Sequence, residues 1–186
     1  MTNSNPLVVS HLTLRRMVGI VGLTLPIILW TMEQRTSISN YYYGGMRDYL
    51  VGALVAIGAF LLAYNGYDRR DKVAGRVAGV AAILVAFCPH LDPVYRALHF
   101  GAAVVFLGAL AYISLALFTQ SGGQMTDRKK TRNAVYRVCG YLILAGVLGT
   151  VAGVVLGHSV FWWEALAVMA FGVSWIVKGE AILADV

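Results

Sequence analysis

The stretch SISNYYYGGMRD, residues Ser37 to Asp48, is the one long polar and aromatic interruption between apolar segments that differs from a simple basic turn. It holds three adjacent tyrosines and two glycines, and its last two residues stand directly before the uncharged apolar run Tyr49 to Tyr67. We predict that this stretch lies on the extracytoplasmic side of a helical membrane bundle. Our hypothesis is that it folds back over the helix ends as a lid.

The composition on both sides of this stretch is that of a membrane protein. Hydrophobic residues make up 59% of the 186 residues and charged residues 13%, and the mean hydropathy is +0.70. Apolar runs recur along the chain that are long enough to cross a hydrocarbon core of ~30 Å, which takes roughly 20 helical residues. The runs lack the alternation of barrel strands, and in lipid the backbone polar groups must find their hydrogen-bond partners within the protein. We therefore predict an all-α membrane bundle.

Six spans are predicted, within a single domain that covers residues 1–186. The first four are expected at about 17–32, 49–67, 73–88 and 93–119, with Asp92 as the N-cap of the fourth and Pro93 as its first helical residue. The 40 residues from Val138 to Val177, in which Glu164 is the one charged residue, would form a single helix about 60 Å long, twice the membrane. They must fold back, and Gly157 to Ser159 is the predicted break.

The distribution of Lys and Arg predicts the orientation of the bundle. Twelve of the 15 lie in the two tails and in the second and fourth connections, and only Arg35, Arg47 and Arg96 lie in the other three. The positive-inside rule then places both termini in the cytoplasm. The same basic connections account for the net charge of +6 and are expected to attract anionic lipid headgroups. Nucleic-acid binding is disfavoured, since no basic domain stands outside the spans.

Unusual polar residues gather on the predicted outer side. Glu164 lies about one turn into the sixth span and His99 almost two turns into the fourth, where ionisable groups are costly unless they are paired or face a polar cavity. The spacing of Asp92, Arg96 and His99 places them on one helix face, which also suits a capped helix start with an ion pair. The predicted ligand-binding residues are Tyr42, Tyr43, Arg47, Asp48, Arg96, His99 and Glu164. We expect Arg47 or Arg96 to be the counter-charge of Glu164.

Three classes of function are open for this outer pocket. The favoured one needs no cofactor: it is the binding of a lipid or small amphiphile, or a role as a membrane partner subunit. The first alternative is a membrane-embedded zinc-dependent hydrolase in which His90, His99 and His158, with an acidic residue, hold the metal. Their spacing matches no HExxH or CxxC pattern, and Ser37 and Ser39 lack the GxSxG context of a serine nucleophile. The second alternative is a small transporter or channel subunit that acts as an oligomer.

Small residues bear on the packing of the bundle. Gly75 and Gly79, and then Gly149, Gly153 and Gly157, recur at four-residue spacing and suit close helix contact. Packing within the chain is favoured over a homo-oligomer interface. The two cysteines, at opposite ends of their helices, predict no intramolecular disulfide.

Three stretches carry a resemblance to known proteins: SISNYYYGGMRD, RNAVYRVCG at Arg132 to Gly140, and FGVSWIVKGE at Phe171 to Glu180. In them the chain resembles a group of small uncharacterised bacterial six-span membrane proteins, and it is distantly similar to the DRAM-like membrane proteins. The resemblance implies a six-helix architecture and a location in the bacterial inner membrane. It brings no established catalytic residue, and the stretch PHLDP lies outside the shared pattern.

Overall fold

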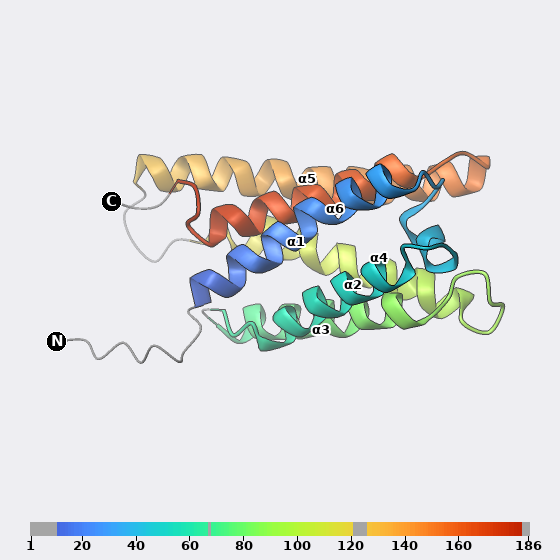
Figure 1. Ribbon diagram of the computed structural model, residues 1–186. Coiled ribbons are helices and arrows are strands. Elements are labelled where there is room, and N and C mark those ends of the chain that lie inside the picture. Colours follow the sequence, from blue (N-terminus) through green and yellow to red (C-terminus); the bar gives the residue numbers. More distant parts are fainter. Residues whose placement is uncertain (1–10, 67, 121–125, 184–186) are drawn as a thin grey trace.

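The computed structural model describes residues 11–66, 68–120 and 126–183, and these residues form an all-helical bundle without strands (Figure 1). Its long helices are α1 (His11–Met32), α2 (Arg47–Ala63), α3 (Arg69–Phe87), α4 (Arg96–Tyr112), α5 (Asp127–Leu156) and α6 (Phe161–Lys178). A short 3-10 helix, η1 (Ile38–Tyr43), precedes α2, and α4 continues into a π-helical turn, η2 (Ile113–Leu117). The predicted all-α fold is confirmed.

The six helices close into a ring. Each helix contacts the next one along the chain, and α6 returns to contact α1. In Figure 1, η1, the α3–α4 connection and the α5–α6 connection meet at one end of the bundle, on the right. The end of α2 and the beginnings of α1, α3 and α5 lie at the opposite end. The polar stretch that opened the sequence analysis therefore shares one end of the bundle with the two loops that contain His90 and His158.

Four segments are long and apolar enough to cross a membrane, which suggests a membrane protein. They are Leu12–Met32, Arg96–Leu117, Asp127–Leu156 and Phe161–Lys178. Two of the six predicted spans do not reach this standard, for different reasons. Helix α2 has only 17 residues, and α3 begins with the charged sequence RRDKVAGR.

Glycines set the closeness of neighbouring helices, as predicted. A Cβ atom on Gly79 of α3 would lie 2.7 Å from the carbonyl oxygen of Gly58 on α2. A Cβ atom on Gly149 of α5 would lie 2.2 Å from the ring of Trp163 on α6. These glycines therefore serve contacts within the chain. Gly157 has a different role, since it ends α5 in the left-handed region at φ 70° and so confirms the predicted break.

Four predicted helix starts were wrong. Helix α1 begins at His11 and not at about Met17, and α3 begins at Arg69 and not near Val73. Helix α5 begins at Asp127 and not at Val138, because the hydroxyl of Thr126 accepts from the Lys129 amide at 3.1 Å and caps a polar extension of the apolar run. Helix α4 begins at Arg96 and not at Pro93. Asp92 instead accepts from the Val94 amide at 2.8 Å and closes the turn before the helix.

Candidate functional site

Residues 36–44, which include η1, form a structured cap on one end of the bundle. Its own residues Ile38 and Tyr41 are buried, and η1 contacts α1, α2 and α6. The Tyr41 hydroxyl donates to the Glu33 carbonyl, and its ring centroid lies 6.1 Å from that of Phe161. Burial raises the pKa of the Tyr41 phenol above its ordinary value. The cap thus folds back over the helix ends, as the sequence predicted.

Glu164, on the first turn of α6, holds this cap in place. Its carboxyl group accepts from the Ser37 hydroxyl at 3.0 Å and from the Ile38 amide at 2.6 Å. The carbonyl of Thr36 accepts from the amides of Val160 and Phe161 at 2.8 and 2.9 Å. The cap and the start of α6 are therefore joined by both side-chain and backbone hydrogen bonds.

The expected arginine counter-charge of Glu164 was wrong. Arg47 is exposed, lies 4.5 Å above the Tyr42 ring and donates to the Tyr42 hydroxyl at 2.9 Å. Arg96 is also exposed and donates to the carbonyls of His90 and Leu91 at 3.4 and 3.5 Å. Arg47 thus bonds to the outside of the cap and Arg96 to the α3–α4 connection, while Glu164 is satisfied by uncharged donors.

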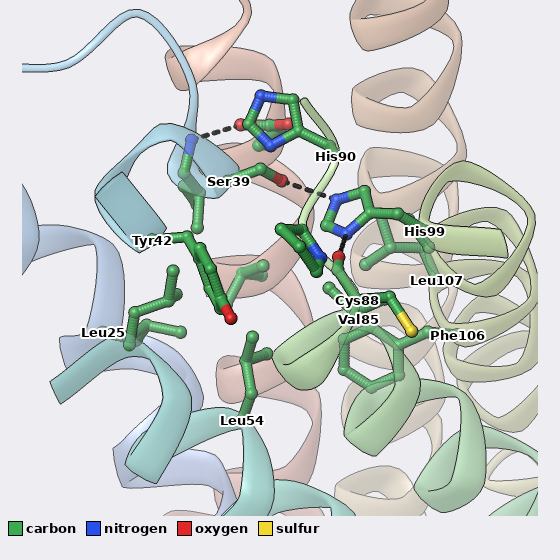
Figure 2. Close-up of a pocket in the computed structure, with 16 residues that line it drawn as sticks. Leu25, Ser39, Tyr42, Leu54, Val85, Cys88, His90, His99, Phe106 and Leu107 are labelled. Carbon is green, nitrogen blue, oxygen red and sulfur yellow. Dashed lines mark hydrogen bonds between the residues drawn. The ribbon is translucent and has the colours of Figure 1, made fainter. Parts of the chain in front are cut away.

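His99 joins the cap to the α3–α4 connection. Its Nδ1 lies 2.7 Å from the Cys88 carbonyl oxygen, and its Nε2 lies 2.9 Å from the Ser39 hydroxyl (Figure 2). A carbonyl oxygen only accepts, so Nδ1 carries a hydrogen and donates. In a neutral ring, Nε2 is then the acceptor for the Ser39 O–H. With 4% of its surface exposed, His99 is fixed by both ring nitrogens.

A second histidine lies beside the first. The ring centroids of His90 and His99 are 5.5 Å apart, and Tyr43 packs edge-on against His90 at 5.4 Å. Burial lowers the pKa of His90, and the neighbouring His99 and Arg96 lower it further. The Tyr43 hydroxyl accepts from the Leu91 amide at 2.9 Å, which ties the cap to the same connection.

Two cavities meet at these residues. The first is a chamber of about 70 Å³ under the cap, large enough for a few water molecules (Figure 2). Its polar lining residues are Ser39, Tyr42, His90, His99 and Glu164, and its other walls are mainly apolar side chains of α1, α2, α3, α4 and α6.

The second cavity, the α4–α5 groove, has a volume of about 480 Å³. Its apolar walls are Phe100, Ala103, Val104 and Leu107 of α4 and Val147, Val151, Val154 and Val155 of α5. Its polar end is formed by Thr36, Ser37, Ser39, Asn40, His90, His99, His158 and Glu164. Val104, Val151, Val154 and Val155 are about half exposed or more, so the groove lies on the outer surface of the bundle. Ser39, His90, His99 and Glu164 line both cavities.

The predicted binding residues divide into two groups. Tyr42, His99 and Glu164 line the chamber, while Arg47 and Asp48 are exposed and line neither cavity. The other two, Tyr43 and Arg96, are also exposed and outside both cavities. No ion pair joins Arg96 to the carboxylate four residues before it, among the contacts that the structure describes.

The histidines of the metal hypothesis lie near one another without forming a ligand set. His90 and His99 pack together, and the exposed His158 reaches the same groove from the α5–α6 connection. In residues 11–66, 68–120 and 126–183, no group of three or more His, Cys, Asp or Glu side chains is placed to hold a metal ion. The two cysteines are free and buried.

Ser39 was missing from the predicted binding residues. The sequence marked it only as a hydroxyl without a nucleophile motif, and its partner His99 is 60 residues away. Nothing in the spacing along the chain signals this pair.

Comparisons with known proteins give no match for this chain, whether with protein-family models, with curated proteins or with solved structures. Its class is therefore defined by its own architecture: an all-helical protein whose four long apolar helices suggest a membrane protein. The resemblance to DRAM-like proteins stays a prediction.

Proposed function

We propose that this chain is a six-span membrane protein that binds a lipid or small amphiphile in the α4–α5 groove, with the polar head at the cap. The observation that carries this proposal is the amphipathic lining of the groove. Valine and leucine side chains line its length, and Ser39, His99 and Glu164 lie at one end. A cavity with apolar walls and a few convergent polar groups is typical of small-molecule sites. In a membrane, the exposed valines of the α4–α5 groove would face lipid tails.

The ring of helices supports six spans. Helices α2 and α3 lie in the ring between α1 and α4, so in a membrane they would stand beside helices that are long enough to cross. Both termini would be cytoplasmic, in keeping with the Lys and Arg distribution, and the resemblance implies the inner membrane of a bacterium. Basic residues at the starts of α3 and α5 would then meet anionic headgroups of the cytoplasmic leaflet.

Groove occupancy can be measured with one blocking variant and one control. We expect lipid extraction and native mass spectrometry of the detergent-purified protein to find a bound amphiphile. Val151→Trp fills the groove wall and should reduce this amphiphile by at least tenfold. Val138→Trp, at an equally exposed position of α5 that lines neither cavity, should retain it. Equal amounts in both variants, or none in the parent protein, would contradict the proposal.

Single introduced cysteines test the orientation. The exposed positions Asp48, Asn65 and Lys130 mark the first, second and fourth connections, and the native cysteines are buried. A membrane-impermeant maleimide should label Asp48→Cys in intact cells. It should label Asn65→Cys and Lys130→Cys only after permeabilisation. Labelling of Asn65→Cys from outside would contradict the six-span arrangement.

A further inference from the structure

We propose that Ser39 and His99 form a nucleophile–base pair that hydrolyses an acyl ester of the bound amphiphile. This inference rests on the proposed binding function, because the α4–α5 groove supplies the seat for the acyl chain. It assigns to this site a chemical step that does not require the histidine ligand set of the zinc hypothesis.

The site contains the three groups that activate a serine: the hydroxyl nucleophile, a base, and a group that orients the base. The Ser39 hydroxyl lies 2.9 Å from Nε2 of His99, and Nδ1 of His99 lies 2.7 Å from the Cys88 carbonyl oxygen. A nucleophile within hydrogen-bond reach of a base, which a third group orients, is the general signature of nucleophilic catalysis. The carbonyl fixes the tautomer that leaves the Nε2 lone pair toward Ser39, as a carboxylate does in the serine protease triad.

The position of the pair favours chemistry over simple core packing. A serine and a histidine that only satisfy each other's hydrogen bonds need no access to a cavity. Here Ser39 is partly exposed, and both residues line the chamber and the polar end of the groove. An ester carbonyl at this junction would be next to the Ser39 hydroxyl while its acyl chain follows the valines of α5.

The oxyanion would be stabilised by His90. The nearest backbone amides are engaged, since the Ile38 amide donates to Glu164 and the Ser39 amide donates to the Ser37 hydroxyl. His90 lines both cavities beside His99, and its buried Nδ1 has no hydrogen-bond partner among the described residues. A neutral imidazole can hold its N–H toward the oxygen where negative charge develops.

The reaction balances with water as the only co-reactant. Ser39 Oγ bonds to the ester carbonyl carbon while His99 Nε2 takes the hydroxyl proton. Collapse of the tetrahedral intermediate breaks the bond to the alcohol oxygen, which leaves with the proton from His99. Water then adds to the acyl-serine and gives a proton to His99. Release of the carboxylic acid returns that proton to Ser39.

The charges of the lining define the substrate class. Glu164 is acidic, and neither cavity has a Lys or Arg among its described lining residues. An anionic phosphate next to the cleaved bond would therefore meet a carboxyl group and no cation. The site fits a long-chain acyl ester of an uncharged or cationic head.

The test uses a long-chain alkyl fluorophosphonate, which phosphonylates an activated serine with loss of fluoride, on the full-length protein in detergent. Peptide mapping should place the adduct on Ser39. Ser39→Ala should lose it, and His99→Asn should slow it at least 100-fold, as expected for loss of a general base. His99→Asn keeps an N–H donor for the Cys88 carbonyl, so its fold is retained. Thr31→Ala removes an exposed hydroxyl that bonds only to the Ile28 carbonyl of its own helix and lines neither cavity, so this control should react normally.

A long-chain 4-nitrophenyl ester in mixed micelles gives the turnover readout, with the same order among the variants. Reaction at another residue, or equal rates for the parent and His99→Asn, would overturn the proposal that Ser39 is the nucleophile and His99 its base. If the parent protein retains its bound amphiphile but shows neither adduct nor turnover, the hydrolase inference fails and the binding function stands. If no amphiphile is bound and Ser39 is inert, both fail.

Discussion

The Ile38 amide nitrogen lies 2.6 Å from Oε2 of Glu164, and this hydrogen bond joins residues that are 126 positions apart in the chain. It connects the first residue of η1 to the first turn of α6. The carboxyl group also accepts from the Ser37 hydroxyl, so one side chain satisfies two donors of the cap. The position of Ser39, and with it the Ser39–His99 contact, therefore depends on Glu164. In this arrangement Glu164 is a positioning residue.

Replacing Glu164 should loosen the cap. In Glu164→Ala, the Ile38 amide and the Ser37 hydroxyl lose their acceptor, which costs about 1–3 kcal/mol for a buried donor. We expect a lower midpoint of thermal unfolding and faster trypsin cleavage after Arg47. Gln34→Ala, at an exposed position outside both cavities, should leave both measurements unchanged. Rapid cleavage of the parent protein at the same site would contradict the lid.

Tyr41 offers a test of the cap from its buried side. Its hydroxyl donates to the Glu33 carbonyl, and its side chain is fully buried. Tyr41→Phe keeps the packing against Phe161 and removes only this hydrogen bond, at a cost of about 0.5–1.5 kcal/mol. Tyr42→Phe is the matched control, since its hydroxyl bonds to the exposed Arg47. A larger loss of thermal stability in Tyr42→Phe than in Tyr41→Phe would contradict this assignment.

The pKa of His90 gives the protein an acid-sensitive element outside its helices. Burial, and then His99 and Arg96, hold the pKa of His90 below its ordinary value of 6.5 in the folded state. The unfolded state therefore binds the proton more readily. Stability from this group is complete above about pH 6.5 and is lost as the pH falls toward the folded-state pKa.

The measurement is the midpoint of thermal unfolding at pH 7.5 and at pH 5. His90→Phe keeps the aromatic contacts with Tyr43 and His99 but cannot be protonated. We expect the parent protein to lose more stability on acidification than this variant. An equal loss in both proteins would assign the acid sensitivity to other groups.

Apolar length predicted the helices well and their polar ends poorly. The run from Val138 to Lys178 was too long for one span, and the break at Gly157 followed from length alone. The start of α5 did not, because the charged sequence from Asp127 to Arg137 continues the same helix beyond the apolar run. Hydropathy locates the apolar part of a helix, whereas the first helical residue depends on an N-cap such as the Thr126 hydroxyl.

The site was predicted residue by residue rather than as a set of contacts. Glu164 and His99 stood out because ionisable residues are rare within apolar runs, and both line the cavities. Their partners could not be read in the same way. Arg47 was chosen by charge, but it lies over the half-buried ring of Tyr42 instead. The partner of His99 proved to be the uncharged Ser39. These pairings depend on how distant loops meet at one end of the bundle.

The glycine contacts between α1 and α6 predict a sharp difference between two conservative substitutions. A Cβ atom on Gly172 would lie 2.5 Å from the Leu23 amide nitrogen and 2.8 Å from the Gly19 carbonyl oxygen, so α1 as a whole would have to move. Gly172→Ala should therefore destabilise the protein by about 1–3 kcal/mol, as overpacking does. In Gly108→Ala the new Cβ meets no atom within 4 Å, and the variant should be as stable as the parent or gain up to ~1 kcal/mol from helix propensity. Thermal unfolding of the two variants in the same detergent makes the comparison, and equal midpoints would show that α1 and α6 do not pack through these glycines.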